Sequence, residues 1–167
     1  MPIRIENSEQ RKNMKPAEHI IDQIPRVLSG SGGDIQAMVG DLQVRIKLAD
    51  RDRLGCLLER LEIKHAQGNP LGFDPTRIAG KVTYLGEALA VIEVEGSGKK
   101  AILRSAPPRS GGELISFFEM VLDRSEGLSL VRYAYDRVRG ERLTVPAPLT
   151  ISTLDRLLTD LIDLAGK

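Results

Sequence analysis

Two kinds of hydrophobic periodicity divide the chain into expected strands and helices. Residues 42–48 alternate apolar and polar side chains, which is typical of a half-buried strand or of the lead-in to the next helix. Residues 50–64 and 111–123 instead carry apolar side chains at helical spacing, so each segment predicts an amphipathic helix. A last helix is predicted after Ser152-Thr153-Leu154-Asp155, which resembles a capping box with Asp in place of Glu.

Strand signals fill the segment between the first two predicted helices. They cover residues 78–105, in which residues 88–95 and 101–105 form an expected hairpin around a Gly-Ser-Gly turn. The alternative for the start of this segment is a short helix that begins at Asp74-Pro75.

A second hairpin is expected before the last helix, from residues 128–137 and 142–145. Pro146 and Pro148 are expected to end the sheet, because proline cannot donate a hydrogen bond to a strand ladder.

The two predicted ββα segments align with each other at a constant offset of 40 residues, the distance from Pro108 to Pro148. The other aligned pairs are Leu114 with Leu154, Phe117 with Leu157, Phe118 with Leu158, Val121 with Leu161, Leu122 with Ile162 and Asp123 with Asp163. Such a unit cannot bury its apolar face alone, so both units are expected to share one core. The predicted fold is α+β, an antiparallel sheet of about five strands with helices on one face, in the order αβββαββα.

Length and composition predict a single domain at residues 35–167 of the 167-residue chain. Residues 1–34 are expected to form a flexible N-terminal tail and linker, which begins with a polar stretch and ends in glycine and serine. Apolar residues make up 41% of the chain, which is enough for one core. No apolar run has the length of a membrane span and the start has no signal-peptide core, so a cytoplasmic location is expected.

The residues that usually carry chemistry form no recognisable site. Cys56 is the only cysteine, which excludes a disulfide framework, and its apolar surroundings favour an inert buried thiol. The only histidines are His19, near the predicted tail, and His65, at the end of a predicted helix. The sequence places no candidate nucleophile beside either of them. Gly96-Ser97-Gly98-Lys99-Lys100 lacks the earlier glycine and the Ser or Thr after lysine that a phosphate loop needs. We therefore expect no catalysis, no cofactor and no bound metal.

Arginines gather around the predicted hairpins. The candidates for an anion-binding patch are Arg104, Arg109, Arg132 and Arg137, with two further arginines after them. Interspersed acidic residues weaken the field, and the net charge of the chain is only +1. Nucleic-acid binding is therefore the alternative function, and a role in protecting the strand edges is favoured for these arginines.

The order of the predicted elements after residue 50 resembles the type III secretion chaperone-like fold, including its YbjN-like members. The segments that carry this likeness are Gly112–Phe118 at the start of the middle helix, the strand–turn–strand at residues 128–142, and Leu149–Leu154 at the start of the last helix.

This resemblance implies a small, non-catalytic and often dimeric protein. It implies a dimer contact at Phe117, Phe118 and Met120. It implies a further partner contact at Leu54, Cys56 and Ile63. The apolar stripe of the predicted middle helix, residues 111–123, is wider than one sheet can cover, which also favours a second buried contact. The sequence therefore predicts a chaperone-like, protein-binding or regulatory module that acts as a homodimer and binds no membrane.

Overall fold

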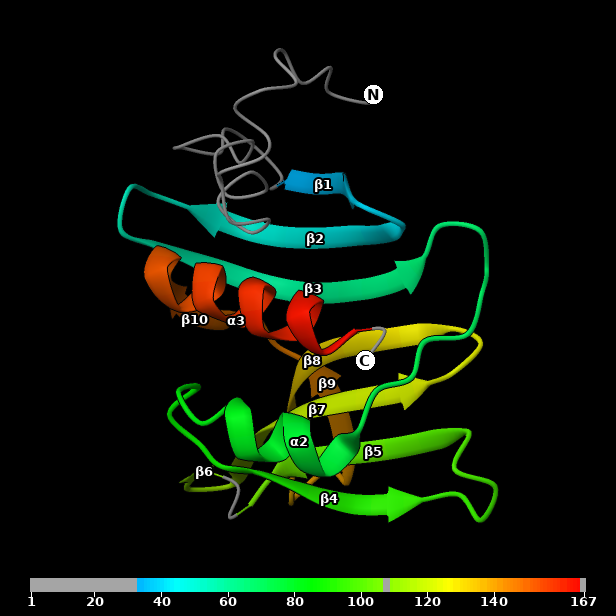
Figure 1. The fold of residues 1–167 in the computed structure, drawn as a ribbon. Helices are drawn as coiled ribbons and strands as arrows, with labels where there is room; N and C mark the ends of the chain where they lie inside the picture. Colours follow the sequence, from blue (N-terminus) through cyan, green and yellow to red (C-terminus); the bar gives the residue numbers. More distant parts are fainter. Residues whose placement is uncertain (1–32, 107–108, 166–167) are drawn as a thin grey trace.

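A computed structural model describes residues 33–106 and 109–165, which form one ten-stranded antiparallel sheet and two helices (Figure 1). The elements are β1 (Gly33–Val39), β2 (Leu42–Arg51), β3 (Gly55–His65), α2 (Pro75–Lys81), β4 (Leu89–Val94), β5 (Lys100–Ser105), β6 (Arg109–Gly111), β7 (Leu114–Asp123), β8 (Gly127–Asp136), β9 (Glu141–Thr144), β10 (Ala147–Thr150) and α3 (Ile151–Leu164). The strand order is β1-β2-β3-β8-β7-β5-β4. In addition, β10 pairs with β3, β6 with β7 and β9 with β8.

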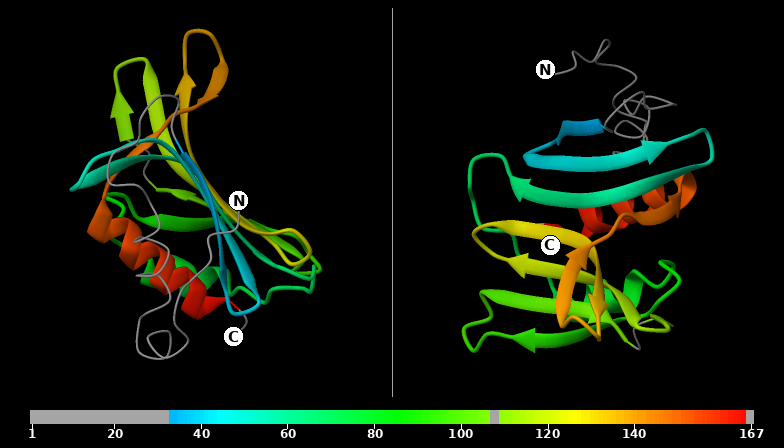
Figure 2. Two further views of the ribbon diagram at one scale, coloured as in Figure 1. Left: turned by 90° about the horizontal axis from the view of Figure 1, so that it is seen from above. Right: turned by 180° about the vertical axis from the view of Figure 1, so that it is seen from behind.

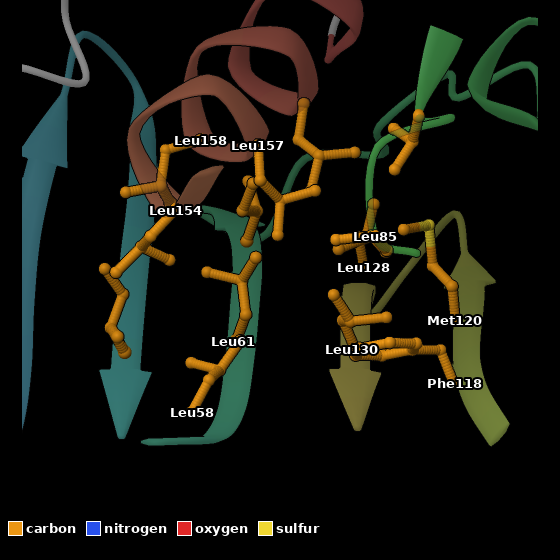
Figure 3. Packing of buried hydrophobic residues seen from close by; sticks show 14 of the residues in the cluster. Leu58, Leu61, Leu85, Phe118, Met120, Leu128, Leu130, Leu154, Leu157 and Leu158 are labelled. Carbon is orange, nitrogen blue, oxygen red and sulfur yellow. The ribbon is translucent and has the colours of Figure 1, made fainter. Parts of the chain in front are cut away.

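The hydrophobic core lies between the two helices and the face of the sheet that they cover, which we call the inner face. Helix α3 contacts β3 and β10, and α2 contacts β4 and β5. In Figure 3, Leu154, Leu157 and Leu158 of α3 point toward the sheet, where Leu58 and Leu61 of β3 lie. Each such buried side chain stabilises the fold by roughly 1.5–3 kcal/mol relative to its exposed state.

Helix α2 begins where the alternative interpretation of the sequence placed it. Asp74 is its N-cap and accepts hydrogen bonds from two backbone N–H groups of the first turn, at 3.0 and 3.4 Å. Pro75 occupies the first turn, where its missing N–H costs nothing. The prediction that strand structure begins at Ile78 is therefore wrong, since Ile78 is a buried residue of α2.

The helix predicted over residues 50–64 is wrong, because this segment forms the end of β2 and almost all of β3. Leu58 and Leu61 are both buried although they are three residues apart. The pairing of β2 with β3 shifts register here, from Lys47 opposite Arg60 to Leu48 opposite Leu58. A β-bulge of this kind gives a strand the three-residue apolar spacing of a helix.

The helix predicted over residues 111–123 is also wrong, because this segment is mostly β7. Phe118 and Met120 lie on the inner face and are buried, while Phe117 and Val121 alternate with them on the opposite face. Both faces of this strand are apolar, and a continuous apolar run does not distinguish a strand from a helix.

The predicted repeat and element order are contradicted by these strands. Leu114 belongs to a strand and its expected counterpart Leu154 to a helix. The ten strands also exceed the predicted five, and the order αβββαββα is not found. The sheet continues past Pro146 into β10, where Pro148 lies opposite Leu57 of β3.

The N-terminal boundary of the sheet falls at Gly33, the first residue of β1. Gly33 and Asp34, which the sequence assigns to the linker, belong to this strand. The rest of the predicted tail and linker lies outside the described residues.

The sheet divides where β3 and β8 part. These strands pair only from Leu61 opposite Leu130 to Ile63 opposite Leu128. Beyond this point the second half of β8 pairs with β9, and the first half of β3 pairs with β10. Val145 and Pro146 connect the two branches, and we call this division the fork. Figure 2 shows the β6–β7 and β8–β9 turns projecting away from the helices.

The turn between β7 and β8 is fixed by one carboxylate and one glycine. Asp123 Oδ1 accepts hydrogen bonds from the Ser125 hydroxyl and from the backbone N–H groups of Ser125 and Glu126, and these bonds lower the pKa of Asp123. Gly127 has a φ of +96°, and a Cβ at this position would lie 2.2 Å from the carbonyl oxygen of Ile63. Only glycine fits here without moving β3 away from β8.

We predict that Gly127→Ala destabilises the protein by about 2 kcal/mol or more, because it adds both backbone strain and a clash with β3. Gly98→Ala is the matched control, since Gly98 also has a positive φ but a Cβ added there would meet no atom within 4 Å. Urea unfolding of both variants measures the difference, and equal losses would contradict the role assigned to the Ile63 contact.

We also predict that Cys56 is unreactive in the folded protein. Its side chain is buried in β3, and burial raises the pKa of the thiol to about 11. At pH 8 roughly one molecule in a thousand then carries the thiolate that alkylating reagents attack. Iodoacetamide labelling followed by intact mass measurement is expected to show modification only after addition of denaturant. Rapid labelling of the folded chain would contradict this prediction.

Candidate functional site

The face of the sheet opposite the helices, which we call the outer face, carries an unusual mixture of aromatic, apolar and charged side chains. Figure 2 shows both helices on the other side of the sheet. Strand pairing places three rows of residues side by side over β5, β7, β8 and β9. These rows are Arg104 with Glu119 and Val131, Phe117 with Tyr133 and Thr144, and Ile115 with Tyr135 and Arg142.

Glu119 is the centre of this surface. Its side chain is only 8% exposed, although no helix of the described residues covers it. Arg104 Nε donates to Glu119 Oε2 at 2.7 Å, and Arg142 Nη2 donates to Oε1 at 3.3 Å. A second, longer contact joins Arg142 Nη1 to Oε2 at 3.5 Å. One carboxylate therefore holds two guanidinium groups, and the three side chains together carry one positive charge.

The side chains of the same two arginines also stack on two aromatic rings. The Cζ atom of Arg142 lies 3.7 Å from the ring centroid of Tyr133, and that of Arg104 lies 5.8 Å from the centroid of Phe117. The two rings are neighbours, with centroids 5.9 Å apart. Stacking and ion pairing together restrict both arginine side chains before any ligand arrives. We call these five residues the Glu119 cluster.

A pocket of about 300 Å³ lies next to this cluster, at the fork. Its lining residues are Lys47, Glu59, Arg60, Val131, Thr144, Val145 and Pro146. Val131 pairs with Glu119 and Thr144 pairs with Tyr133, so the pocket continues the rows of the cluster. Lys47 Nζ lies 3.4 Å from a carboxylate oxygen of Glu59, which partly neutralises the pocket rim. We call this cavity the fork pocket.

The apolar residues that the sequence proposes as contacts do not gather on one surface. Phe118, Met120, Cys56 and Ile63 are buried inside the core, where they hold the fold together. Leu54 lies in the turn between β2 and β3 and is 82% exposed. Of these candidates, Phe117 alone lies in the Glu119 cluster.

The candidate arginines Arg104 and Arg132 are also divided between different surfaces. Arg104 lies in the Glu119 cluster, whereas Arg132 lies on the inner face and forms an ion pair with Glu87 at 2.7 Å. The Arg132 side chain also lies over the ring of Phe118, with 4.6 Å between Cζ and the ring centroid. Arg137 follows β8 in an exposed turn, and Arg109 lies in β6. Arg104 and Arg132 therefore lie on opposite faces of the sheet and do not share one anion-binding patch.

Sequence reasoning missed Glu119 and Tyr133, and it counted Arg142 only as one of the arginines around the hairpins. Their proximity depends on the register of β7 with β5, β8 and β9, which brings together residues from three separate segments. The one available signal was Glu119 itself, an acidic residue inside an otherwise apolar run. A carboxylate at such a position needs a cationic partner when it becomes buried.

The fold and this surface together define a class of protein. Its members would have a single curved antiparallel sheet, with helices on one face and a charged aromatic cluster on the other. No family model matches this chain, and no curated protein or solved structure matches it significantly. The resemblance to the type III secretion chaperone-like fold therefore stays a prediction. Within the described residues, no helix is long and apolar enough to cross a membrane, and no group of three or more potential metal ligands is found.

We predict that Glu119→Ala destabilises the fold by about 1–3 kcal/mol, because it leaves two arginine side chains facing each other without their shared carboxylate. The partial exposure of both arginines keeps the expected loss below that of a fully buried pair. Glu93→Ala, at an exposed position of β4, is the control and is expected to change stability by less than about 0.5 kcal/mol. Urea unfolding that gives the same loss for both variants would argue against a structural role for Glu119.

Proposed function

We propose that this protein is a non-catalytic, cytoplasmic protein-binding module and that a partner protein docks on the outer face around the Glu119 cluster. The observation that carries the proposal is the ordered arrangement of Arg104 and Arg142 over Phe117 and Tyr133. Arginine and aromatic residues are the side chains that dominate the binding energy of protein interfaces.

The physical character of the outer face supports docking of a protein. Apolar side chains continue the surface on both sides of the cluster, with Ile102 and Val121 on one side and Ile115 and Tyr135 on the other. Tyr135 is 38% exposed and Phe117 is half-buried. Burial of such a surface against a partner contributes favourably to the free energy of binding. Side chains that are already held in position lose little further conformational entropy when the partner binds.

The homodimer expected from the sequence stays a prediction. Its original support was an apolar middle helix, and the described residues place that segment in β7. A second copy of the chain is nevertheless one protein that can occupy the outer face, so the oligomeric state belongs in the test. Nucleic-acid binding gains no specific support from the positions of the arginines.

We predict that Tyr135→Asp removes partner binding without unfolding the chain, because it adds a desolvated charge to the interface. Phe117→Ser, which removes one ring of the cluster, is a second variant. Ile92→Asp makes a comparable change at an exposed position on β4, a strand that contributes no residue to the Glu119 cluster. Affinity purification from a native extract, with mass spectrometry, compares the proteins recovered by the four chains.

The expected result is a set of proteins recovered by wild type and Ile92→Asp and lost with Tyr135→Asp and Phe117→Ser. Light scattering on the same samples shows whether wild type dimerises and whether the two outer-face variants are monomers. Circular dichroism melting confirms that each variant is folded. Recovery of the same proteins by all four folded chains, together with an unchanged oligomeric state, would overturn the proposal.

A further inference from the structure

Strand β9 has an open edge at the fork. It pairs with β8 on one side, and within residues 33–106 and 109–165 no strand pairs with its other side. All four of its residues are exposed. An unpaired strand edge presents a row of backbone donors and acceptors to any extended chain that approaches it.

The hydrogen bonds of β9 show which backbone groups face that edge. The N–H of Val145 donates to the carbonyl oxygen of Arg132 in β8 at 3.0 Å. In an antiparallel ladder, residues alternate between those that bond to the neighbour and those that do not. Leu143 therefore bonds toward β8, and the N–H and C=O groups of Arg142 and Thr144 point toward the open edge.

The side chains of these two residues face the surface described above. Arg142 belongs to the Glu119 cluster, and Thr144 lines the fork pocket. The same two residues thus present unpaired backbone groups at the edge and functional side chains on the outer face. An extended chain that pairs with β9 would place alternate side chains over the outer face, beside Arg142.

The charge of the site selects the chemistry of such a chain. The Nε atom of Arg142 and both Nη atoms of Arg104 make no hydrogen bond to another described residue. Glu119 neutralises only one of the two guanidinium charges. The excess positive charge and the unused donors are complementary to a carboxylate, which guanidinium groups bind through two parallel hydrogen bonds.

We propose that the outer face binds an extended, acidic segment of a partner protein, which adds as a strand to the open edge of β9. A glutamate or aspartate of the segment binds Arg142, and an apolar side chain two residues along, on the same face of the segment, enters the fork pocket over Val131. This inference rests on the proposed function and specifies its partner. Backbone pairing supplies affinity and the side-chain contacts supply specificity, as in other cases of strand addition.

The test uses the full chain and fluorescent synthetic peptides with the repeat Glu-Thr-Val-Thr, which places glutamate and valine on the same face of an extended chain. Binding is followed by fluorescence anisotropy. A peptide with the repeat Lys-Thr-Val-Thr controls for charge, and the glutamate peptide N-methylated at alternate residues controls for strand pairing. Arg142→Gln removes the cation, and Arg139→Gln is its control in the exposed β8–β9 turn. Thr144→Pro removes an N–H at the open edge while leaving the bonds to β8, and Thr144→Val is its control.

We expect the glutamate peptide to bind wild type, Arg139→Gln and Thr144→Val, and to bind Arg142→Gln and Thr144→Pro about tenfold more weakly or worse. Binding is expected to weaken at high salt. The lysine peptide and the N-methylated peptide are expected not to bind.

Four results would overturn the inference. The first is equal binding of the lysine and glutamate peptides, and the second is full binding to Thr144→Pro. The third is a wild-type dimer that Thr144→Pro dissociates, since a second copy would then occupy the edge of β9. The fourth is the absence of any peptide binding. The proposed function is decided separately by the Tyr135 and Phe117 variants, whose effect does not depend on the edge of β9.

Discussion

Six buried leucine and isoleucine side chains hold α3 against β3 and β10, and this contact decides which face of the sheet belongs to the core. Helix α2 is joined to α3 on the same side. Tyr84, which follows α2, donates a hydrogen bond to Asp160 of α3 at 2.7 Å, and burial together with this bond raises the pKa of the Tyr84 hydroxyl. Because α2 and α3 both lie on the inner face, no helix in the described part of the chain covers the aromatic and apolar residues of the outer face. The candidate site is a consequence of this one-sided packing.

The local chemistry of several elements can be predicted from the sequence alone. The hairpin of β4 and β5 and the strands β8 and β9 fall where periodicity and turn residues place them. The helix α3 also forms where expected, but its N-cap is Thr150, so the predicted capping box beginning at Ser152 is wrong. Asp74 and Pro75 signal α2 through a capping interaction that depends only on neighbouring residues. These elements share one property: the interactions that define them are local or follow a single clean period.

The failures have a common physical cause, which is tertiary structure that imitates helical spacing. In β3 a bulge places Leu58 and Leu61 three residues apart on one face. In β7 apolar side chains lie on both faces, because those of the inner face pack in the core and those of the outer face lie in or beside the Glu119 cluster. The Glu119 cluster was beyond prediction for a related reason. Arg104, Glu119 and Arg142 come from three strands whose register is fixed by long-range pairing, and one residue of slip would move Glu119 into the core.

The fork connects the fold to the candidate site. Strand β8 is long enough to pair with β3 over its first half and with β9 over its second half, so the sheet must divide between them. On the inner side of this division Arg132 is occupied by Glu87 and by the ring of Phe118. On the outer side Arg142 is stacked on Tyr133 but keeps donors that no described residue uses. Two arginines of neighbouring strands thus differ in their access to a partner, because the Arg132 side chain is 12% exposed and the Arg142 side chain is 40% exposed. An arginine that is ordered but unsaturated, beside an open strand edge and a pocket, is what recognition of an extended acidic chain requires.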